Sequence, residues 1–146
     1  MNHDDPFRLR IPADIFTAML DHARAELPNE CVGFLAGTVL NGVGVVSQFL
    51  PLTNALASPT AFATEASSLF AAYKLMRLAG TDVLAIYHSH PTSAPVPSST
   101  DLASNTYGPN VMWLIISPKT EPPGVRGWWL GADYRTACWE VVDVFS

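Results

Sequence analysis

Apolar and polar residues alternate at the N-terminal end in a way that predicts a short strand followed by a helix. Residues 8–11 alternate as in an edge strand, and Pro12 suits the first turn of a helix, where its missing N–H is not needed. Apolar side chains then recur at helical spacing until Pro28 stops the pattern. These side chains are Ile15, Phe16, Met19, Leu20, Ala23 and Leu27.

Residues 31–64 carry no charged side chain, and their first part predicts a buried hairpin. The stretch CVGFLAGTVLNGVGVVSQFL, residues 31–50, reads as two strands joined by Asn41 and Gly42, which readily adopt the positive φ angles of a tight turn. Glycines, polar residues and Pro51 interrupt the run, so it lacks the roughly 18 apolar residues in a row of a membrane helix. The sequence therefore favours a hairpin and not a membrane span.

A second helix and four more strands follow the hairpin. Thr64 is predicted to cap this helix, with Glu65 in its first turn and Gly80 at its end. Its inner stripe is expected to consist of Leu69, Ala72, Tyr73 and Met76. Strands are predicted over residues 82–90, 111–117, 124–131 and 138–145. This order favours a mixed β-sheet flanked by helices, an α/β (α+β) layer fold.

Composition indicates one domain with a dense core. A length of 146 residues is typical of a single domain, which we expect to span residues 1–146. Only 14% of the residues are charged, against about 25% in average soluble proteins, whereas 49% are hydrophobic. This balance favours self-association as a homodimer. Adjacent Trp128 and Trp129 must point to opposite sides of their strand, so one of them is expected to be exposed and able to contact a partner chain.

Charge and cysteine content restrict the partners and the compartment. The net charge is −5 and the eight Lys and Arg residues are scattered, so neither nucleic acid nor an acidic membrane is an expected partner. Cys31 and Cys138 form no CxxC pair, which favours a reduced cytoplasmic compartment, although a bridge between them stays an alternative. The polar, acidic N-terminus does not resemble a secretion signal.

The stretch YHSHPTSAPVPSSTD, residues 87–101, carries the candidate chemistry. Side chains alternate across a strand, so His88 and His90 point to the same side and can bind one ion together, while Ser89 points away. Asp101 can add a carboxylate, because the prolines between stiffen the loop that returns it to the strand end. Two imidazoles and one carboxylate with an open fourth position are typical of a catalytic zinc site. The alternative is that His-Ser-His is only a polar strand end.

Two motifs in this sequence resemble the JAMM (MPN+) metalloproteases. HSHP, six further residues and SSTD are similar to the family signature H-x-H-P-x6-S-x-x-D. The matching positions are His88, His90, Pro91, Ser98 and Asp101. Upstream, ECVGFLAG, residues 30–37, is similar to the family's E-x-x-G-[LF]-L-x-G. A weaker similarity extends over nearly the whole chain and implies the cytidine-deaminase-like JAMM/MPN fold.

The resemblance implies a role for each matching residue. His88, His90 and Asp101 would hold one zinc ion, which lowers the pKa of a water molecule to about 7. Glu30 would be the general base that takes the water's proton and passes it to the leaving amine. Ser98 would donate a hydrogen bond to the oxyanion, although it also suits the cap of a helix.

One cysteine and two further histidines are interpreted without a catalytic role. Cys31 abuts Glu30, but a nucleophilic cysteine needs a histidine partner, and both suitable histidines are assigned to the metal. We therefore interpret Cys31 as core packing. His22 lies beside the apolar stripe of the first helix and His3 at the chain end, and both are interpreted as structural or solvated.

The resemblance also implies the reaction and its substrates. JAMM proteins of this kind hydrolyse the peptide or isopeptide bond after the C-terminal glycine of a ubiquitin-like protein. The segment after Asp101 is short, and in this respect the chain resembles compact prokaryotic enzymes of the family. Those enzymes act on small ubiquitin-like or sulfur-carrier proteins with a Gly-Gly tail. We expect that tail to lie extended beside a strand edge near the zinc. The alternatives are a catalytically silent MPN scaffold, and a structural zinc domain with Cys31 as fourth ligand.

Overall fold

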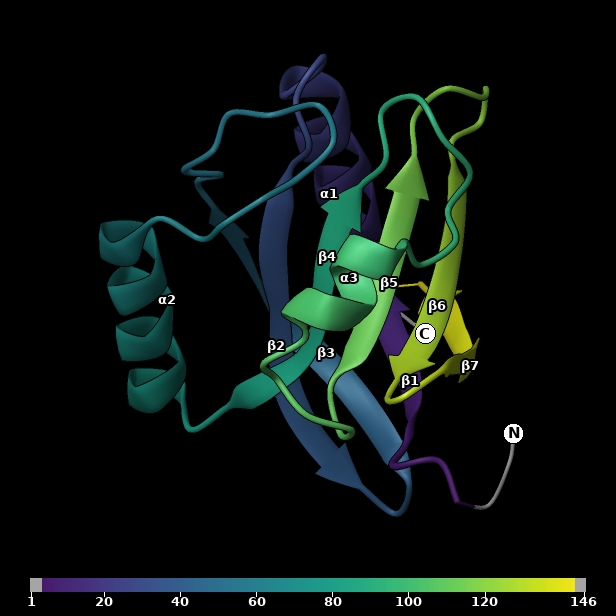
Figure 1. Ribbon diagram of the computed structural model, residues 1–146. Coiled ribbons are helices and arrows are strands. Elements are labelled where there is room, and N and C mark those ends of the chain that lie inside the picture. Colours follow the sequence, from purple (N-terminus) through teal and green to yellow (C-terminus); the bar gives the residue numbers. More distant parts are fainter. Residues whose placement is uncertain (1–3, 144–146) are drawn as a thin grey trace.

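A computed structural model describes residues 4–143, in which the strands form one mixed sheet flanked by helices (Figure 1). The helices are α1 (Ala13–Ala25), α2 (Ala66–Ala79) and α3 (Ser99–Ser104). The strands are β1 (Arg8–Pro12), β2 (Val32–Leu40), β3 (Val43–Leu52), β4 (Asp82–Ser89), β5 (Met112–Ser117), β6 (Gly124–Leu130), β7 (Tyr134–Thr136) and β8 (Trp139–Val142). Their order is β7-β6-β5-β4-β2-β3-β1-β8. The α/β (α+β) layer fold predicted from the sequence is confirmed.

The predicted hairpin is β2 and β3, and its turn has the expected geometry. Asn41 and Gly42 adopt φ angles of 52° and 75°, which close the two-residue turn between Leu40 and Val43. The last three residues of β2, 38–40, are exposed, however, so only the inner part of the hairpin is buried as predicted. This inner part of β2 lies between β3 and β4, in the middle of the sheet.

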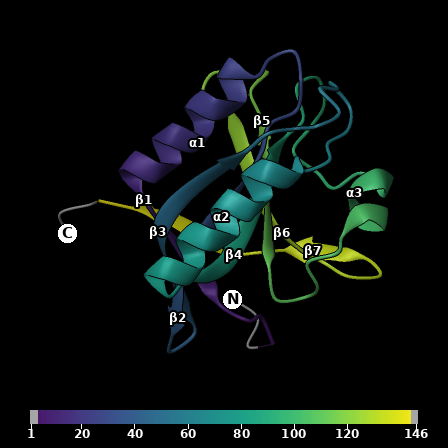
Figure 2. The same ribbon diagram turned by 90° about the vertical axis from the view of Figure 1, so that its left-hand side faces the viewer.

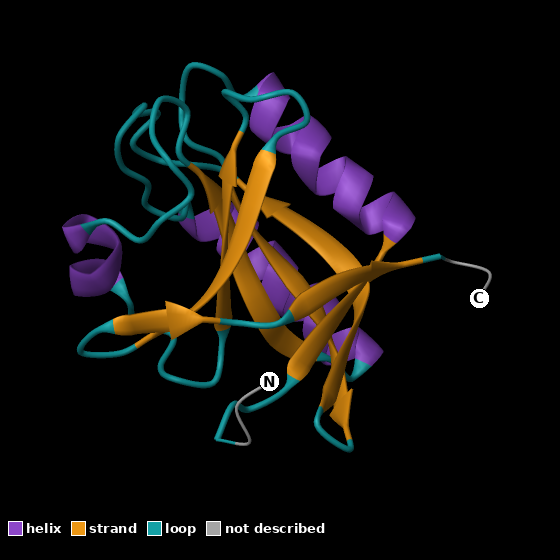
Figure 3. Cartoon of the chain, turned by 90° about the vertical axis from the view of Figure 1, so that its right-hand side faces the viewer, coloured by secondary structure: helices purple, strands orange, loops and turns teal. Residues whose placement is uncertain are grey.

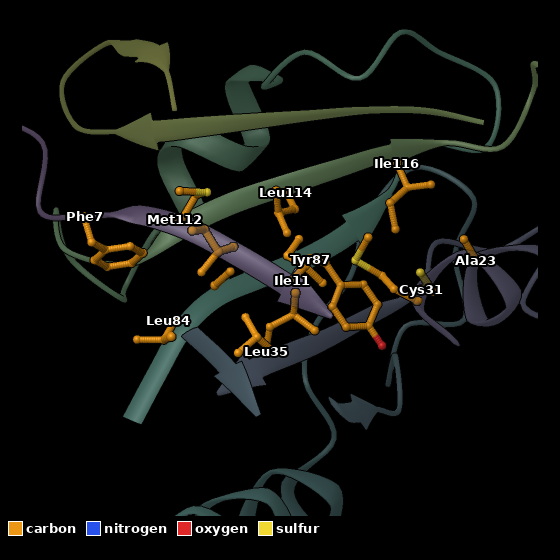
Figure 4. Packing of buried hydrophobic residues seen from close by; sticks show 14 of the residues in the cluster. Phe7, Ile11, Ala23, Cys31, Leu35, Leu84, Tyr87, Met112, Leu114 and Ile116 are labelled. Atoms are coloured by element: carbon orange, nitrogen blue, oxygen red, sulfur yellow. The ribbon is translucent and has the colours of Figure 1, made fainter. Parts of the chain in front are cut away.

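The sheet separates two hydrophobic clusters, one on each face. Figures 2 and 3 show the helices that flank the sheet. Helix α1 packs on one face through Met19 and Ala23, against a cluster that includes Cys31 and Tyr87 (Figure 4). Helices α2 and α3 cover the other face, where Met76 packs with residues of β2, β4 and β5. A strand residue therefore belongs to the α1 face or to the α2 and α3 face according to the side of the pleat it occupies.

Several expectations about single residues are wrong. β1 is no edge strand, because it pairs with β3 on one side and β8 on the other. Trp128 and Trp129 do point to opposite faces, but each enters a different cluster and neither is exposed. Leu27 lies beyond the end of α1 and is 45% exposed. Strand β7 has no counterpart in the sequence prediction, and residues 144–145 of the predicted last strand lie outside the described residues.

The start of α2 also differs from the prediction. Glu65 itself is the N-cap, and its carboxylate accepts hydrogen bonds from the N–H groups of Ser67 and Ser68. Thr64 pairs instead with Asn54 in an isolated β-bridge that closes the loop between β3 and α2. The end of α2 is as predicted, because Gly80 adopts a left-handed φ of 70°. Tyr73, expected to point inward, is exposed.

The two cysteines do not pair with each other, and His22 joins two elements of the fold. Both cysteines are free, with Cys31 buried and Cys138 exposed, so the alternative of a disulfide between them does not hold. His22 Nδ1 lies 2.7 Å from the Tyr87 hydroxyl and links α1 to β4, whereas His3 lies outside the described residues. In the described part of the chain, no helix is both long and apolar enough to cross a membrane.

Gly33 is required where β2 passes the Tyr87 ring, and replacing it should destabilise the fold. A Cβ at Gly33 would overlap the ring of Tyr87, its cross-strand partner. We expect Gly33→Ala to lower the free energy of unfolding by about 1–3 kcal/mol, the usual cost of overpacking. Gly124→Ala is the matched control, because a Cβ there meets only ordinary contacts, the nearest at 3.7 Å. Equal denaturant midpoints for the two variants would contradict this account.

Candidate metal centre and active site

The end of β4 brings two imidazoles to the sheet face that α2 and α3 cover. His88 points to this face and packs edge-on against Trp113. Ser89 points to the opposite side, where its Oγ accepts a hydrogen bond from the N–H of Cys31 at 2.8 Å. His90 follows the last residue of β4, and its N–H donates to Ile116 O at 2.8 Å. The histidine that follows the strand is thus held by the neighbouring strand.

The third group comes from the first turn of α3. Ser98 is the N-cap of this helix, and its Oγ accepts from the N–H of Asp101 at 3.0 Å. In return, Oδ2 of Asp101 accepts from the N–H of Ser98 at 2.9 Å. The spacing S-x-x-D is therefore that of a capping box. This reciprocal pair fixes the carboxylate on the side of α3 that faces the histidines.

Three ligand atoms converge in this place. Nε2 of His88 lies 3.1 Å from Nε2 of His90 and 3.1 Å from Oδ1 of Asp101, and Nε2 of His90 lies 3.1 Å from Oδ2 of Asp101. All three side chains are buried. Donor atoms about 2.0–2.1 Å from a tetrahedral ion lie roughly 3.3 Å from one another, so the arrangement fits a small divalent cation.

The hydrogen bond at the far side of the His90 ring supports the same interpretation. Nδ1 of His90 lies 2.9 Å from the carbonyl oxygen of Ala94. A neutral ring that carries its proton there offers the lone pair of Nε2 to a cation, whereas a protonated ring donates from Nε2 to Asp101. Nδ1 of His88 is buried with no partner, and its ring lies against Phe62 at 5.0 Å between centroids. His90 and Asp101 can thus present acceptors to one point, which suits a cation, while no hydrogen bond at Nδ1 fixes the tautomer of His88.

Burial and charge pairing set the protonation states of these groups. Burial lowers the pKa of His88, which favours its neutral, metal-binding form. For Asp101, burial opposes ionisation, but hydrogen bonds from His88 and His90 outweigh it and hold the pKa well below its usual range. Burial also lowers the pKa of His90, yet its bonds to Asp101 and Ala94 reverse the sign and raise the pKa overall.

Glu30 lies beside this group, at the entry to β2. Val32 pairs with His88, and the same antiparallel register carried two residues further places Glu30 opposite His90. Only 4% of Glu30 is exposed, and its Oε1 is buried with no hydrogen-bond partner. Burial raises the pKa of Glu30 to about 7, against the opposing charge of His90. A carboxyl with this pKa can accept and release a proton near neutral pH.

Cys31 does not complete the group as a fourth ligand. It belongs to the cluster on the α1 face, on the other side of the sheet from His88. Burial raises the pKa of its thiol to about 12, so the thiolate that binds a metal is disfavoured. Among the described residues, the group with metal-ligand spacing contains His88, His90 and Asp101 alone. This observation weighs against the structural zinc domain.

The loop between β3 and α2 contributes residues that the sequence analysis did not single out. The Asn54 side chain donates to the carbonyl oxygen of Glu30 at 3.1 Å. Phe62 of the same loop packs against His88. These two residues belong to no charged motif and no regular periodicity, so no local signal in the sequence singles them out.

Comparisons with known proteins give consistent results. A family model described as prokaryotic homologs of the JAB domain matches residues 12–131. Desampylase from Haloferax volcanii is 32% identical over 133 residues, which cover 88% of this chain and 92% of that protein. CysO-cysteine peptidase from Mycobacterium tuberculosis is 33% identical over 111 residues, 76% of this chain and 74% of that protein. A solution structure of a protein from Desulfitobacterium hafniense has a TM-score of 0.83 at 28% identity, and covers 92% of this chain and 93% of that one.

Proposed function

Because the chain belongs to the family of prokaryotic homologs of the JAB domain, we propose that it is a zinc-dependent peptidase of protein conjugates. Its substrate is a ubiquitin-like or sulfur-carrier protein, and the bond it cleaves follows the carrier's C-terminal glycine. Family membership confirms the resemblance to JAMM proteins and the hydrolase class that the sequence predicts. The observation that carries the proposal is the buried His88, His90 and Asp101 group with Glu30 beside it.

In this proposal each residue has a defined role in the reaction. A zinc ion held by His88, His90 and Asp101 would act as a Lewis acid that lowers the pKa of a water molecule to about 7. Glu30 takes the proton of the attacking water on its carboxylate and delivers it to the leaving nitrogen. Ser98 donates its hydroxyl hydrogen to the oxyanion, while the Oγ lone pair stays with the N–H of Asp101.

The path of the substrate tail beside a strand edge near the zinc stays a prediction. β4 is paired with β2 on one side and β5 on the other, so the strand that leads to the histidines has no free edge. An extended Gly-Gly tail would therefore need an edge near the site other than that of β4. The homodimer, the cytoplasmic location and the single domain over residues 1–146 stay predictions.

One panel of substrates tests the proposal. The zinc-loaded protein is incubated with fusions of ubiquitin-like and sulfur-carrier proteins that end in Gly-Gly, with and without a chelator. We expect cleavage after the last glycine that stops when the chelator removes the metal. Bound zinc without cleavage of any fusion would instead support the alternative, a catalytically silent scaffold.

Ser98 is expected to serve both the reaction and the helix cap. Ser98→Ala should lower turnover by about 10² to 10³, the usual effect of removing one oxyanion donor. It should also lower stability by about 1 kcal/mol, because α3 loses its cap. The measurement is kcat together with the thermal midpoint, and Ser99→Ala serves as control, since Ser99 is exposed and adjacent. A variant that loses only stability would exclude Ser98 from the reaction.

A further inference from the structure

The backbone of Glu30 is held differently from the backbone of the next residue. The N–H of Cys31 donates to Ser89 Oγ and its carbonyl accepts from the N–H of Ser89, so the chain is tied to β4 at this point. Glu30 precedes Cys31, and its backbone groups no longer pair with β4. Its N–H donates to Ser58 O at 2.8 Å, and its carbonyl accepts from Asn54 Nδ2 at 3.1 Å. Both backbone groups of Glu30 are thus satisfied by the loop between β3 and α2.

Asn54 connects this loop to Glu30 with a fully used side chain. Its Oδ1 accepts from the N–H groups of Leu56 and Ala63, each at 3.1 Å, which shapes the loop itself. Its Nδ2 donates to Ala61 O at 3.0 Å and to Glu30 O at 3.1 Å. Two donors and two acceptors are all that an asparagine side chain offers. The one of these four bonds that leaves the loop is the bond to Glu30.

We propose that Asn54 is a positioning residue, which fixes the Glu30 carboxylate relative to His88, His90 and Asp101 through the Glu30 backbone. The inference rests on the proposed function, because Glu30 is the proton carrier there. Glu30 has a buried Oε1 without a partner, so no described side chain sets its orientation at that atom. The position of the carboxylate therefore depends on the Glu30 backbone. A shift of about 1 Å in a catalytic group can lower the rate about 10²-fold.

Asn54→Asp tests the hydrogen bonds that the side chain donates separately from those that it accepts. An aspartate keeps the two bonds that Oδ1 accepts but can no longer donate to Glu30 O or Ala61 O. The base of the loop stays closed, because Ala55 N–H donates to Ala63 O and Glu65 N–H to Thr53 O. Ser68→Ala is the matched control: it removes the side-chain acceptor of Thr53 N–H, another bond of this loop, without contact to Glu30.

The kinetic test compares these variants on a Gly-Gly fusion that the wild type cleaves. Asn54→Asp should lower kcat about 10- to 100-fold with KM within about twofold and one metal ion per chain retained, while Ser68→Ala keeps the wild-type kcat. In a Glu30→Gln background, Asn54→Asp should cause no further loss, because it acts through Glu30. An unchanged kcat, or the same loss in both backgrounds, would overturn the inference.

A second readout does not depend on turnover. Hydrogen exchange of the Glu30 amide reports whether the loop still holds it, since this amide is bonded to Ser58 O. Exchange should accelerate in Asn54→Asp and stay at the wild-type rate in Ser68→Ala. If the wild type cleaves no fusion, the proposed function fails, and the amide exchange still decides whether Asn54 holds Glu30. Unaltered exchange in Asn54→Asp would refute the positioning role.

Discussion

Replacement of Glu30 by Gln is expected to abolish most turnover while the protein keeps its metal. Gln fills the same volume but cannot take a proton, so the rate should fall by the 10² to 10⁴ that general acid and base catalysis typically contributes. Metal content should stay at the wild-type value, because Glu30 is not in the group of ligand atoms. The measurement is kcat on a Gly-Gly fusion together with metal analysis of the same sample.

Glu26→Gln is the control for this experiment. Glu26 is an exposed acid four residues upstream, and its removal should leave kcat unchanged. Thermal midpoints of both variants show whether a loss of rate comes from unfolding. A Glu30→Gln variant that works at the wild-type rate would exclude Glu30 as the base and with it the assigned reaction.

Removal of the Asp101 carboxylate is expected to abolish metal binding. Asp101→Ala takes away one ligand and the negative charge that faces both imidazoles, so stoichiometric binding of zinc and all metal-dependent turnover should be lost. His88→Ala should have the same effect, and it should also lower the stability because it opens a space beside Trp113. The measurement is calorimetric titration of the metal-free variant with zinc.

Asp14→Ala is the matched control. Asp14, like Asp101, is an acid in the first turn of a helix, but it is exposed whereas Asp101 is buried. It should bind zinc like the wild type. Zinc binding by Asp101→Ala with unchanged stoichiometry and affinity would mean that the ion is held elsewhere.

Local sequence signals predicted the parts of the fold that local chemistry decides. Asn41 and Gly42 form the tight turn because few other pairs accept two positive φ angles in a row. Gly80 ends α2 because glycine adopts the left-handed conformation without a steric penalty. The candidate site was also readable, because alternation along β4 and a capping box at α3 are both short-range patterns. The roles of the residues in it stay predictions.

Features that depend on distant partners were missed. Whether β1 is an edge strand depends on β8, more than a hundred residues later, and no local pattern records that pairing. Trp129 is covered because Phe7 packs edge-on against it at 5.2 Å, another contact from the far end of the chain. Asn54 reads as an ordinary loop residue, since its bond to Glu30 appears only when the loop folds back. Tertiary contacts of this kind override local propensity.

The most direct test is a crystal structure of the zinc-soaked protein with anomalous data on both sides of the zinc absorption edge. We expect one strong peak about 2.0–2.2 Å from Nε2 of His88, Nε2 of His90 and a carboxylate oxygen of Asp101. A map without a peak between these three side chains, or with zinc bound only at other residues, would contradict the metal centre and every step assigned to it.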